Sequence, residues 1–403
     1  MHNGLKVALL ALACFATSIS EFAIVGMIDV VAASAGVSVA MAGQLLTAFA
    51  LSGGIGVPIV VMALSPLERR DVMTVSLALV VAGCVLMSVV SDFYLMMLSR
   101  VFMAIGSGIF AVTCFATAPQ LAAPGREASA VATVTLGFNA ALVLGLPFSR
   151  LMVQALPWTA VFWFVGIASA IMIPVVRAIV PHAKDAAPKP LRQQLAYLKR
   201  PRVLLTFGLN LFWVAGYATL YSYITPFLQE STTLGAATLS AVLLAFGVST
   251  LVGNKVGGWL CDRLGMRPVV LAALAGQAVL LVALFALGGP TWLVVTAVLV
   301  WGIFSWIPSP IINLAVVQAA PEAADVMLSL NNSATQFAYA IGAGAGGVVV
   351  AGAGAHPLCL VSIALIAAAA VAGFHATKSS RDENAAAGAA NVETAQPLAA
   401  EQA

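Results

Sequence analysis

Two charged side chains interrupt long apolar stretches of the chain. Glu21 lies within the sequence ISEFAI, and Arg100 lies within LSRVFM. A charge inside hydrocarbon is costly unless it is paired or hydrated, so we expect both side chains to face a polar interior. Burial disfavours an ionised carboxylate whereas a neighbouring guanidinium favours it, so Glu21 beside Arg100 is suited to taking up and releasing a proton. The alternative is a static buried ion pair that fixes how two helices pack.

A second acid, Asp29, follows Glu21 by eight residues in the same apolar region. It is either a further acid of the same interior cavity or a solvated helix end. We group Glu21, Arg100 and Asp29 as the candidate residues for proton exchange.

Uncharged polar and aromatic side chains recur at helical spacing in the second half of the chain. The set consists of Asn210, Trp213, Tyr217, Tyr221, Asn332, Gln336 and Tyr339. Flat aromatic walls with uncharged donors and acceptors suit a neutral, hydroxylated or aromatic ligand. Hydrogen bonds between helices and aromatic belts at a membrane interface would explain any one of these residues, but less easily all of them.

The elements that must position these residues are membrane-spanning helices. Of the 403 residues, 62% are apolar and only 8% are charged, and the mean hydropathy is +1.04. A soluble domain carries about 25% charged residues, so this composition excludes an ordinary soluble protein. With about 20 apolar residues needed per span, we predict twelve spans, near 5–28, 41–63, 72–90, 94–117, 127–151, 159–179, 203–227, 236–256, 268–288, 291–316, 326–352 and 356–375.

Basic residues favour one side of this predicted topology. Sixteen of the 18 Lys and Arg residues fall in the connections on the side of the chain ends, and only Arg100 and Arg150 fall toward the other side. Short cytoplasmic loops retain Lys and Arg, so we predict that both termini are cytoplasmic. The chain then divides into a six-helix bundle (1–180), a basic cytoplasmic linker (181–202), a second six-helix bundle (203–376) and a disordered tail (377–403).

A short charged turn between two apolar runs carries the most specific motif. Residues 258–267 follow the pattern G-x-L-x-D-R-x-G-x-R, with Gly258, Asp262, Arg263, Gly265 and Arg267 at the defined positions. A related turn, 65–71, contains Arg69 and Arg70 and occupies the equivalent place in the first half. Two halves of similar length, each with such a turn, indicate a duplicated architecture.

This spacing resembles the signature loop of the major facilitator superfamily of transporters, and the resemblance extends over about residues 5–375. It is closest to the drug:proton antiporter branch and, within it, to the arabinose efflux permease group with its sugar, purine-nucleoside and chloramphenicol exporters. Ser20-Glu21-Phe22 followed by Gly26 resembles that group's first-helix motif, the segment 98–108 around Arg100 resembles the fourth-helix motif, and Gly145-Leu146-Pro147 resembles the antiporter motif.

The resemblance implies a proton-driven exporter that alternates between inward- and outward-open states in a bacterial inner membrane. It also implies that Asp262 and Arg263 stabilise one of those states. The first-half turn departs from the pattern, because Ser65 and Glu68 replace the usual Asp and Gly. Asp29 departs as well, since the group usually has proline near that position.

The remaining expectations concern chemistry and partners. The four histidines fall at termini, in loops or at helix ends, and the sequence contains no Walker loop, metal-ligand cluster or hydrolase triad, so we expect no enzyme activity and no cofactor. The expected partners are a small-molecule substrate, protons and membrane lipids, with no nucleic acid, and a monomer suffices. Two alternatives remain open: a facilitative or symporting uptake carrier on the same fold, and a non-transporting membrane sensor or enzyme.

Overall fold

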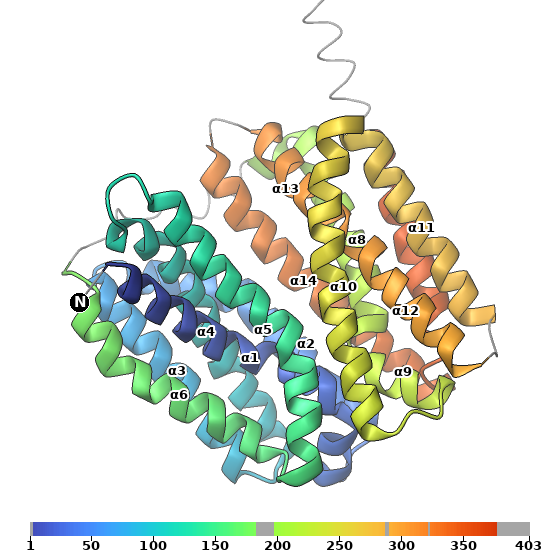
Figure 1. Ribbon diagram of the computed structural model, residues 1–403, viewed down its shortest axis with the longest axis horizontal. Helices are drawn as coiled ribbons and strands as arrows, with labels where there is room; N and C mark the ends of the chain where they lie inside the picture. The colour runs from blue at the N-terminus through green and yellow to red at the C-terminus, as the bar shows by residue number, and fades with distance from the viewer. Residues whose placement is uncertain (1–2, 183–196, 287–289, 321–322, 377–403) are drawn as a thin grey trace, which may run out of the picture.

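The computed structural model describes residues 3–182, 197–286, 290–320 and 323–376, and within these ranges the chain is helical without a strand (Figure 1). Twelve of its helices are long and apolar enough to cross a membrane. Helices are expected there, because backbone amides and carbonyls in hydrocarbon must bond within their own segment. The prediction of an all-α membrane protein with twelve spans is confirmed.

The first six spanning helices pack as one bundle, coloured blue to green in Figure 1. They are α1 (Asn3–Ala35), α2 (Val39–Leu64), α3 (Arg69–Val89), α4 (Phe93–Leu121), α5 (Glu127–Ala155) and α6 (Thr159–Ile179). Their connections are short, and the starts of α2 and α4 are capped by side chains. The Ser38 hydroxyl accepts a hydrogen bond from the Met41 amide (3.1 Å), and the Asp92 carboxylate accepts one from the Leu95 amide (3.0 Å).

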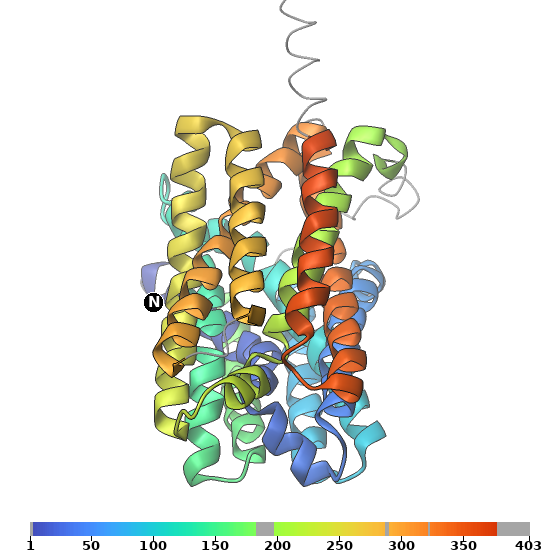
Figure 2. The same cartoon turned by 90° about the vertical axis from the view of Figure 1, so that its right-hand side faces the viewer.

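The second bundle follows a short 3₁₀ turn, η1 (Tyr197–Lys199). Its helices are α8 (Pro201–Tyr221), α9 (Ile224–Ser231), α10 (Ala236–Leu264), α11 (Met266–Ala286), α12 (Thr291–Trp306), α13 (Pro308–Ala319), α14 (Ala324–Ala353) and a last helix, Leu358–Ala376. Figure 2 shows this bundle from its outer side. Most of the predicted linker and the whole predicted tail lie outside the described residues.

Three spans depart from the continuous helices that we predicted. In α1, Met27 has non-helical backbone angles (φ −136°, ψ 23°). The predicted span 203–227 divides at Tyr223, whose hydroxyl donates to the carbonyl of Ala343 in α14 (3.0 Å). The predicted span 291–316 divides before Pro308, where proline begins a new helix because it lacks an amide hydrogen.

The helix ends define two faces of the molecule. We call the end that carries Asn3 and the tight turn at Gly265 the N-terminal face, and the end that carries Gly36 and Gly354 the opposite face. Gly265 has φ +84°, a left-handed conformation that suits glycine, and it connects α10 directly to α11. In Figure 1 the two bundles lie side by side and approach each other closely near α9, at the opposite face.

Candidate functional site

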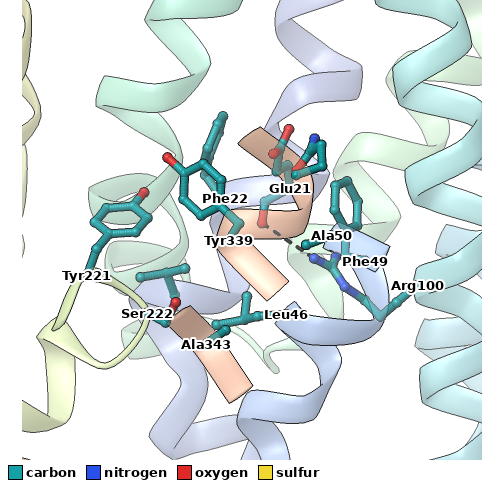
Figure 3. A pocket seen from close by; sticks show the side chains of 12 residues that line it. Glu21, Phe22, Leu46, Phe49, Ala50, Arg100, Tyr221, Ser222, Tyr339 and Ala343 are labelled. Carbon is teal, nitrogen blue, oxygen red and sulfur yellow. Dashed lines mark hydrogen bonds between the residues drawn. The ribbon is translucent and has the colours of Figure 1, made fainter. Parts of the chain in front are cut away.

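Glu21 lies at the centre of the molecule and lines two adjoining pockets between the bundles. The larger one, the main cavity, has a volume of about 250 Å³ and is formed by α1, α5, α8, α13 and α14 together with Trp306. The smaller one lies between α1, α2, α4, α8 and α14 (Figure 3). The side-chain amide of Gln336, from the second bundle, interacts with the Glu21 carboxylate. Glu21 is therefore the acid that both bundles share.

Arg100 is completely buried in α4 and holds α1 and α2 in place through their main chains. Among the described residues, its nitrogen–oxygen bonds go to the carbonyls of Ser20 (2.5 Å), Glu21 (3.4 Å) and Leu45 (3.3 Å) rather than to the Glu21 carboxylate. Figure 3 shows Arg100 beside Glu21. Its guanidinium also lies 4.4 Å from the centre of the Phe49 ring. The static ion pair considered as the alternative is thus not what these bonds form: Arg100 is a cation fixed beside the backbone of Glu21, and the Glu21 carboxylate faces the pockets.

A cluster of aromatic rings from the second bundle forms part of the wall of the main cavity and extends to Tyr221 in the smaller pocket and to the buried Trp301. Tyr217 stacks on Tyr221 and Trp301, with ring centres 4.9 and 5.5 Å apart. Trp306 and Tyr339 stand nearly perpendicular to Tyr217, at interplanar angles of 86° and 83°. Such stacked and edge-to-face pairs hold one another rigidly and expose flat faces to a ligand.

Several polar groups of this wall have no protein partner. In the described part of the chain, the hydroxyls of Tyr217 and Tyr221 and the indole nitrogen of Trp306 are buried without a hydrogen bond. Buried polar groups normally find partners, so unpaired donors beside a cavity indicate groups available to a ligand or to water. By contrast, the Trp213 indole donates to the Ser305 carbonyl (3.0 Å) and serves the packing of α8 on α12.

The structure brings together most of the residues that we predicted for the substrate cavity. Trp213, Tyr217, Asn332, Gln336 and Tyr339 line the main cavity, and Tyr221 lines the smaller pocket. Asn210 does not line either of these two pockets. It is buried and donates to the hydroxyl of Thr335 (2.9 Å), which does line the main cavity. Asn210 therefore positions Thr335 in the cavity wall and does not itself face the cavity.

Other lining residues were not anticipated from the sequence. Phe22, Phe138 and Leu142 form the wall contributed by the first bundle, and Ser309 and Thr335 add hydroxyls from the second. An apolar residue within an apolar helix cannot be recognised from the sequence as a cavity residue. Phe22, Phe138 and Leu142 are identified only by the way α1 and α5 pack against the second bundle.

Asp29 has an environment that neither sequence interpretation foresaw. Both of its carboxylate oxygens accept from Nη1 of Arg150 in α5 at 2.8 Å, and one accepts from the Gln229 amide in α9 at 2.9 Å. The side chains of Arg150 and Asp29 are 9% and 24% exposed. Asp29 thus lies in a polar contact that joins the two bundles near the opposite face, and not at a solvated helix end.

Further contacts surround this group, which we call the outer polar cluster (Asp29, Arg150 and Gln229). The Thr225 hydroxyl of α9 donates to the Val25 carbonyl of α1 (2.9 Å), and the Gln154 amide of α5 donates to Ser240 of α10 (3.4 Å). These contacts lie where α9 and the start of α10 meet the ends of α1 and α5. They close the opposite face of the molecule in this conformation.

In the charged turn of the second half, two arginine side chains lie over aromatic rings. The Arg263 guanidinium lies 4.1 Å from the centre of the Trp259 ring, and that of Arg267 lies 4.5 Å from the Phe374 ring. Asp262 is exposed, and Gly258 has open space around its α-carbon. In this conformation, therefore, the described contacts of both arginines attach the turn to its own bundle.

The degenerate turn of the first half retains ionic contacts of its own. Glu68 interacts with Nδ1 of His182 at 2.6 Å and lies 3.9 Å from Arg70, while Asp71 pairs with Arg177 of α6 at 3.2 Å. Arg69 is buried, with only 4% of its surface exposed. The turn is thus tied to α6 and the start of the linker.

Close packing of α1 on α5 fixes the level of Glu21. A Cβ at Gly26 would collide with the Leu146 carbonyl, and a Cβ at Gly145 would lie 3.1 Å from Cβ of Phe22. Pro147 lies inside α5 at the same level. Glycine at these positions lets the two helices approach, which places the Glu21 carboxylate between the bundles.

Two packed bundles of spanning helices, with a polar and aromatic cavity between them, define a membrane transport protein. The sequence profile of the Major Facilitator Superfamily matches residues 10–343, so the chain belongs to that family. It is 33% identical over 348 residues to the uncharacterised MFS-type transporter YbcL of Bacillus subtilis (strain 168), covering 86% of this chain and 89% of the relative. It is 28% identical over 362 residues to the inner membrane transport protein YdhP of Escherichia coli (strain K12), covering 90% and 93%.

Proposed function

We propose that the chain is a proton-coupled antiporter that exports a small neutral or amphipathic molecule, such as a sugar, a nucleoside or a drug of the chloramphenicol type. The observation that carries this proposal is the position of Glu21. It lines both central pockets, faces Gln336 of the other bundle, and has a fixed cation, Arg100, bound to its main-chain carbonyl. A protonatable group at the contact between two moving bodies couples its proton to their movement.

Alternating access supplies the mechanism. With the opposite face closed by the outer polar cluster, a substrate enters the main cavity from the N-terminal face and contacts Tyr217, Gln336 and Tyr339. Rocking of the bundles then exposes the cavity to the other side, where the substrate leaves and Glu21 takes up a proton. Return of the protonated carrier releases that proton at the N-terminal face. The basic connections at this face support its assignment to the cytoplasm.

The energetics are compatible with one proton per substrate, or slightly more. Moving one elementary charge across 100 mV releases about 2.3 kcal/mol. A hundredfold gradient of a neutral substrate costs about 2.7 kcal/mol, since each tenfold difference corresponds to about 1.4 kcal/mol. No cofactor is required in this scheme, because the proton gradient supplies the driving force.

Proton release from proteoliposomes tests the proposal. The purified protein is reconstituted with a trapped pH dye, a pH gradient is imposed, and sugars, nucleosides, chloramphenicol and lipophilic cations are added in turn. Substrate-dependent proton movement that is lost in Glu21→Gln supports antiport. Glu127→Gln is the matched control, because it makes the same chemical change at an exposed helix start.

The direction of movement separates the alternatives. Protons and substrate that move in the same direction would identify an uptake symporter, and substrate movement without protons would identify a facilitator. If the Glu21→Gln variant still couples substrate movement fully to proton movement, Glu21 is not the proton-coupling residue. Binding of a panel compound without movement of either species would favour a sensor.

A further inference from the structure

A third pocket, with a polar lining, also adjoins the main cavity. It has a volume of about 160 Å³ and lies between α5 and α10, with Leu142 and Trp306 lining both spaces. Its polar lining consists of Asn139 from the first bundle and Thr250, Asn254 and Lys255 from the second. We call it the inner chamber. Because two residues line both spaces, a single ligand can occupy them together.

The packing of the helices places the inner chamber closer to the N-terminal face than Glu21. Gly145 packs on Phe22, so it lies at the level of Glu21. Asn139 precedes Gly145 by six residues, which is about 9 Å along a helix. On α10, Gly247 packs on Val143, and Asn254 follows it by seven residues, or about 10 Å.

The two spaces differ in chemistry. The residues described as lining the main cavity include one carboxylate, Glu21, and no lysine, arginine or histidine. The inner chamber instead has one cation, Lys255, which is exposed, and two side-chain amides. An ammonium group and amide N–H groups donate hydrogen bonds to carboxylate, carbonyl or hydroxyl oxygens. The chambers therefore favour opposite ends of a ligand.

We propose that the inner chamber is a second ligand subsite that binds the hydrogen-bond-accepting or anionic end of an elongated amphipathic substrate. The donor or cationic end of that substrate lies at Glu21 and Gln336, and its flat middle packs against Leu142 and Trp306. This inference rests on the proposed transport function and narrows its substrate class. It favours molecules with a flat centre and two polar ends about 10 Å apart over compact sugars.

Three rigid probes with a common centre test the subsite. They are 4-(aminomethyl)biphenyl, biphenyl-4-carboxylate, and 4′-(aminomethyl)biphenyl-4-carboxylate, which carries both ends. Binding to purified protein in lipid nanodiscs is measured by calorimetry. We expect the two-ended probe to bind about tenfold more tightly than either other probe, the effect of one additional charge-assisted hydrogen bond.

Substitutions in the inner chamber test whether the carboxylate end of the probe lies there. Lys255→Met keeps the apolar stem and should weaken both carboxylate-bearing probes about tenfold while leaving the amine-only probe unchanged. Asn254→Ala should weaken the same two probes by a smaller factor. Lys6→Met, at the start of α1, is the matched control for loss of one positive charge. The thermal midpoint and size-exclusion profile of each variant establish that it is folded.

The outcomes distinguish the subsite from the proposed function. Unchanged affinities in Lys255→Met, or equal weakening by Lys6→Met, would overturn the subsite. The subsite would also be overturned if none of the three probes binds wild-type protein that still couples another compound to protons. That result would leave the proposed antiport intact. A selective effect of Lys255→Met in a protein that moves no protons would support the subsite and contradict antiport.

Discussion

Removal of the Asp29 charge should open the opposite face of the molecule. In Asp29→Asn, the bond from Gln229 loses its ionised acceptor, and Arg150 loses the partner that contacts it at 2.8 Å. A hydrogen bond to a charged group contributes about 1.5–3 kcal/mol, against about 1 kcal/mol for a neutral pair. The bond between the bundles therefore weakens by about 0.5–2 kcal/mol. That difference corresponds to about a 2- to 30-fold shift in population.

Distance measurements between spin labels provide the assay. Labels at Ala33 and Thr233, both exposed at the ends of the two bundles on the opposite face, report its opening. The native cysteines must first be replaced, and four of the five are buried, namely Cys14, Cys84, Cys114 and Cys359. Asp29→Asn should convert the short label distance of this conformation into a mixture with a longer one. Gln229→Ala should have the same direction of effect without unpairing Arg150.

Asp92→Asn is the matched control for the Asp29 substitution. Asp92 lies at the same face and accepts a hydrogen bond from the Leu95 amide within its own bundle (3.0 Å). The same change in charge should therefore leave the label distances as in wild type. If Asp29→Asn also leaves them unchanged, or shifts them toward closure, the outer polar cluster does not hold this face shut.

Three further predictions concern packing, the buried cation and the charged turn. Arg100→Lys should reduce coupled transport at least about tenfold in proteoliposomes, because one ammonium cannot reproduce the fork of bonds to three carbonyls; wild-type rates would contradict this. Gly26→Ala should destabilise the protein by about 1–3 kcal/mol through overpacking against Leu146, and an unaltered thermal midpoint would show that the helices separate without cost. Asp262→Asn should slow turnover while ligand affinity stays constant, and equal turnover would exclude a role in state exchange.

The number of spans was predictable because each one expresses a local property. About 20 consecutive apolar residues are needed wherever a helix crosses hydrocarbon, whatever its neighbours. Helix ends were less predictable. The span expected at 236–256 continues to Leu264 in α10, because charged residues such as Lys255 and Arg263 are good helix formers once they lie outside the hydrocarbon. Hydropathy marks the membrane boundary and not the helix boundary.

The candidate site was predictable only in part. Glu21 and Arg100 are visible in the sequence because charges are rare in such surroundings, but the direction of the Arg100 hydrogen bonds depends on main-chain oxygens that no sequence pattern marks. The partners of Asp29 are 121 and 200 residues away along the chain. Contacts over such separations require the arrangement of both bundles. The helix break at Met27 was also not predictable, because α1 contains no proline that would indicate it.

That break gives the first helix two separately held segments. The segment before Met27 contains Glu21 and is fastened to α4 through Arg100, whereas the segment after it contains Asp29 and is fastened to α5 of its own bundle and to α9 of the other bundle. A change in a few backbone angles can reorient one segment without moving the other. Under the proposed antiport, the residues around Glu21 and those around Asp29 are therefore able to change independently, and proton exchange and the ease with which the opposite face opens become separately adjustable.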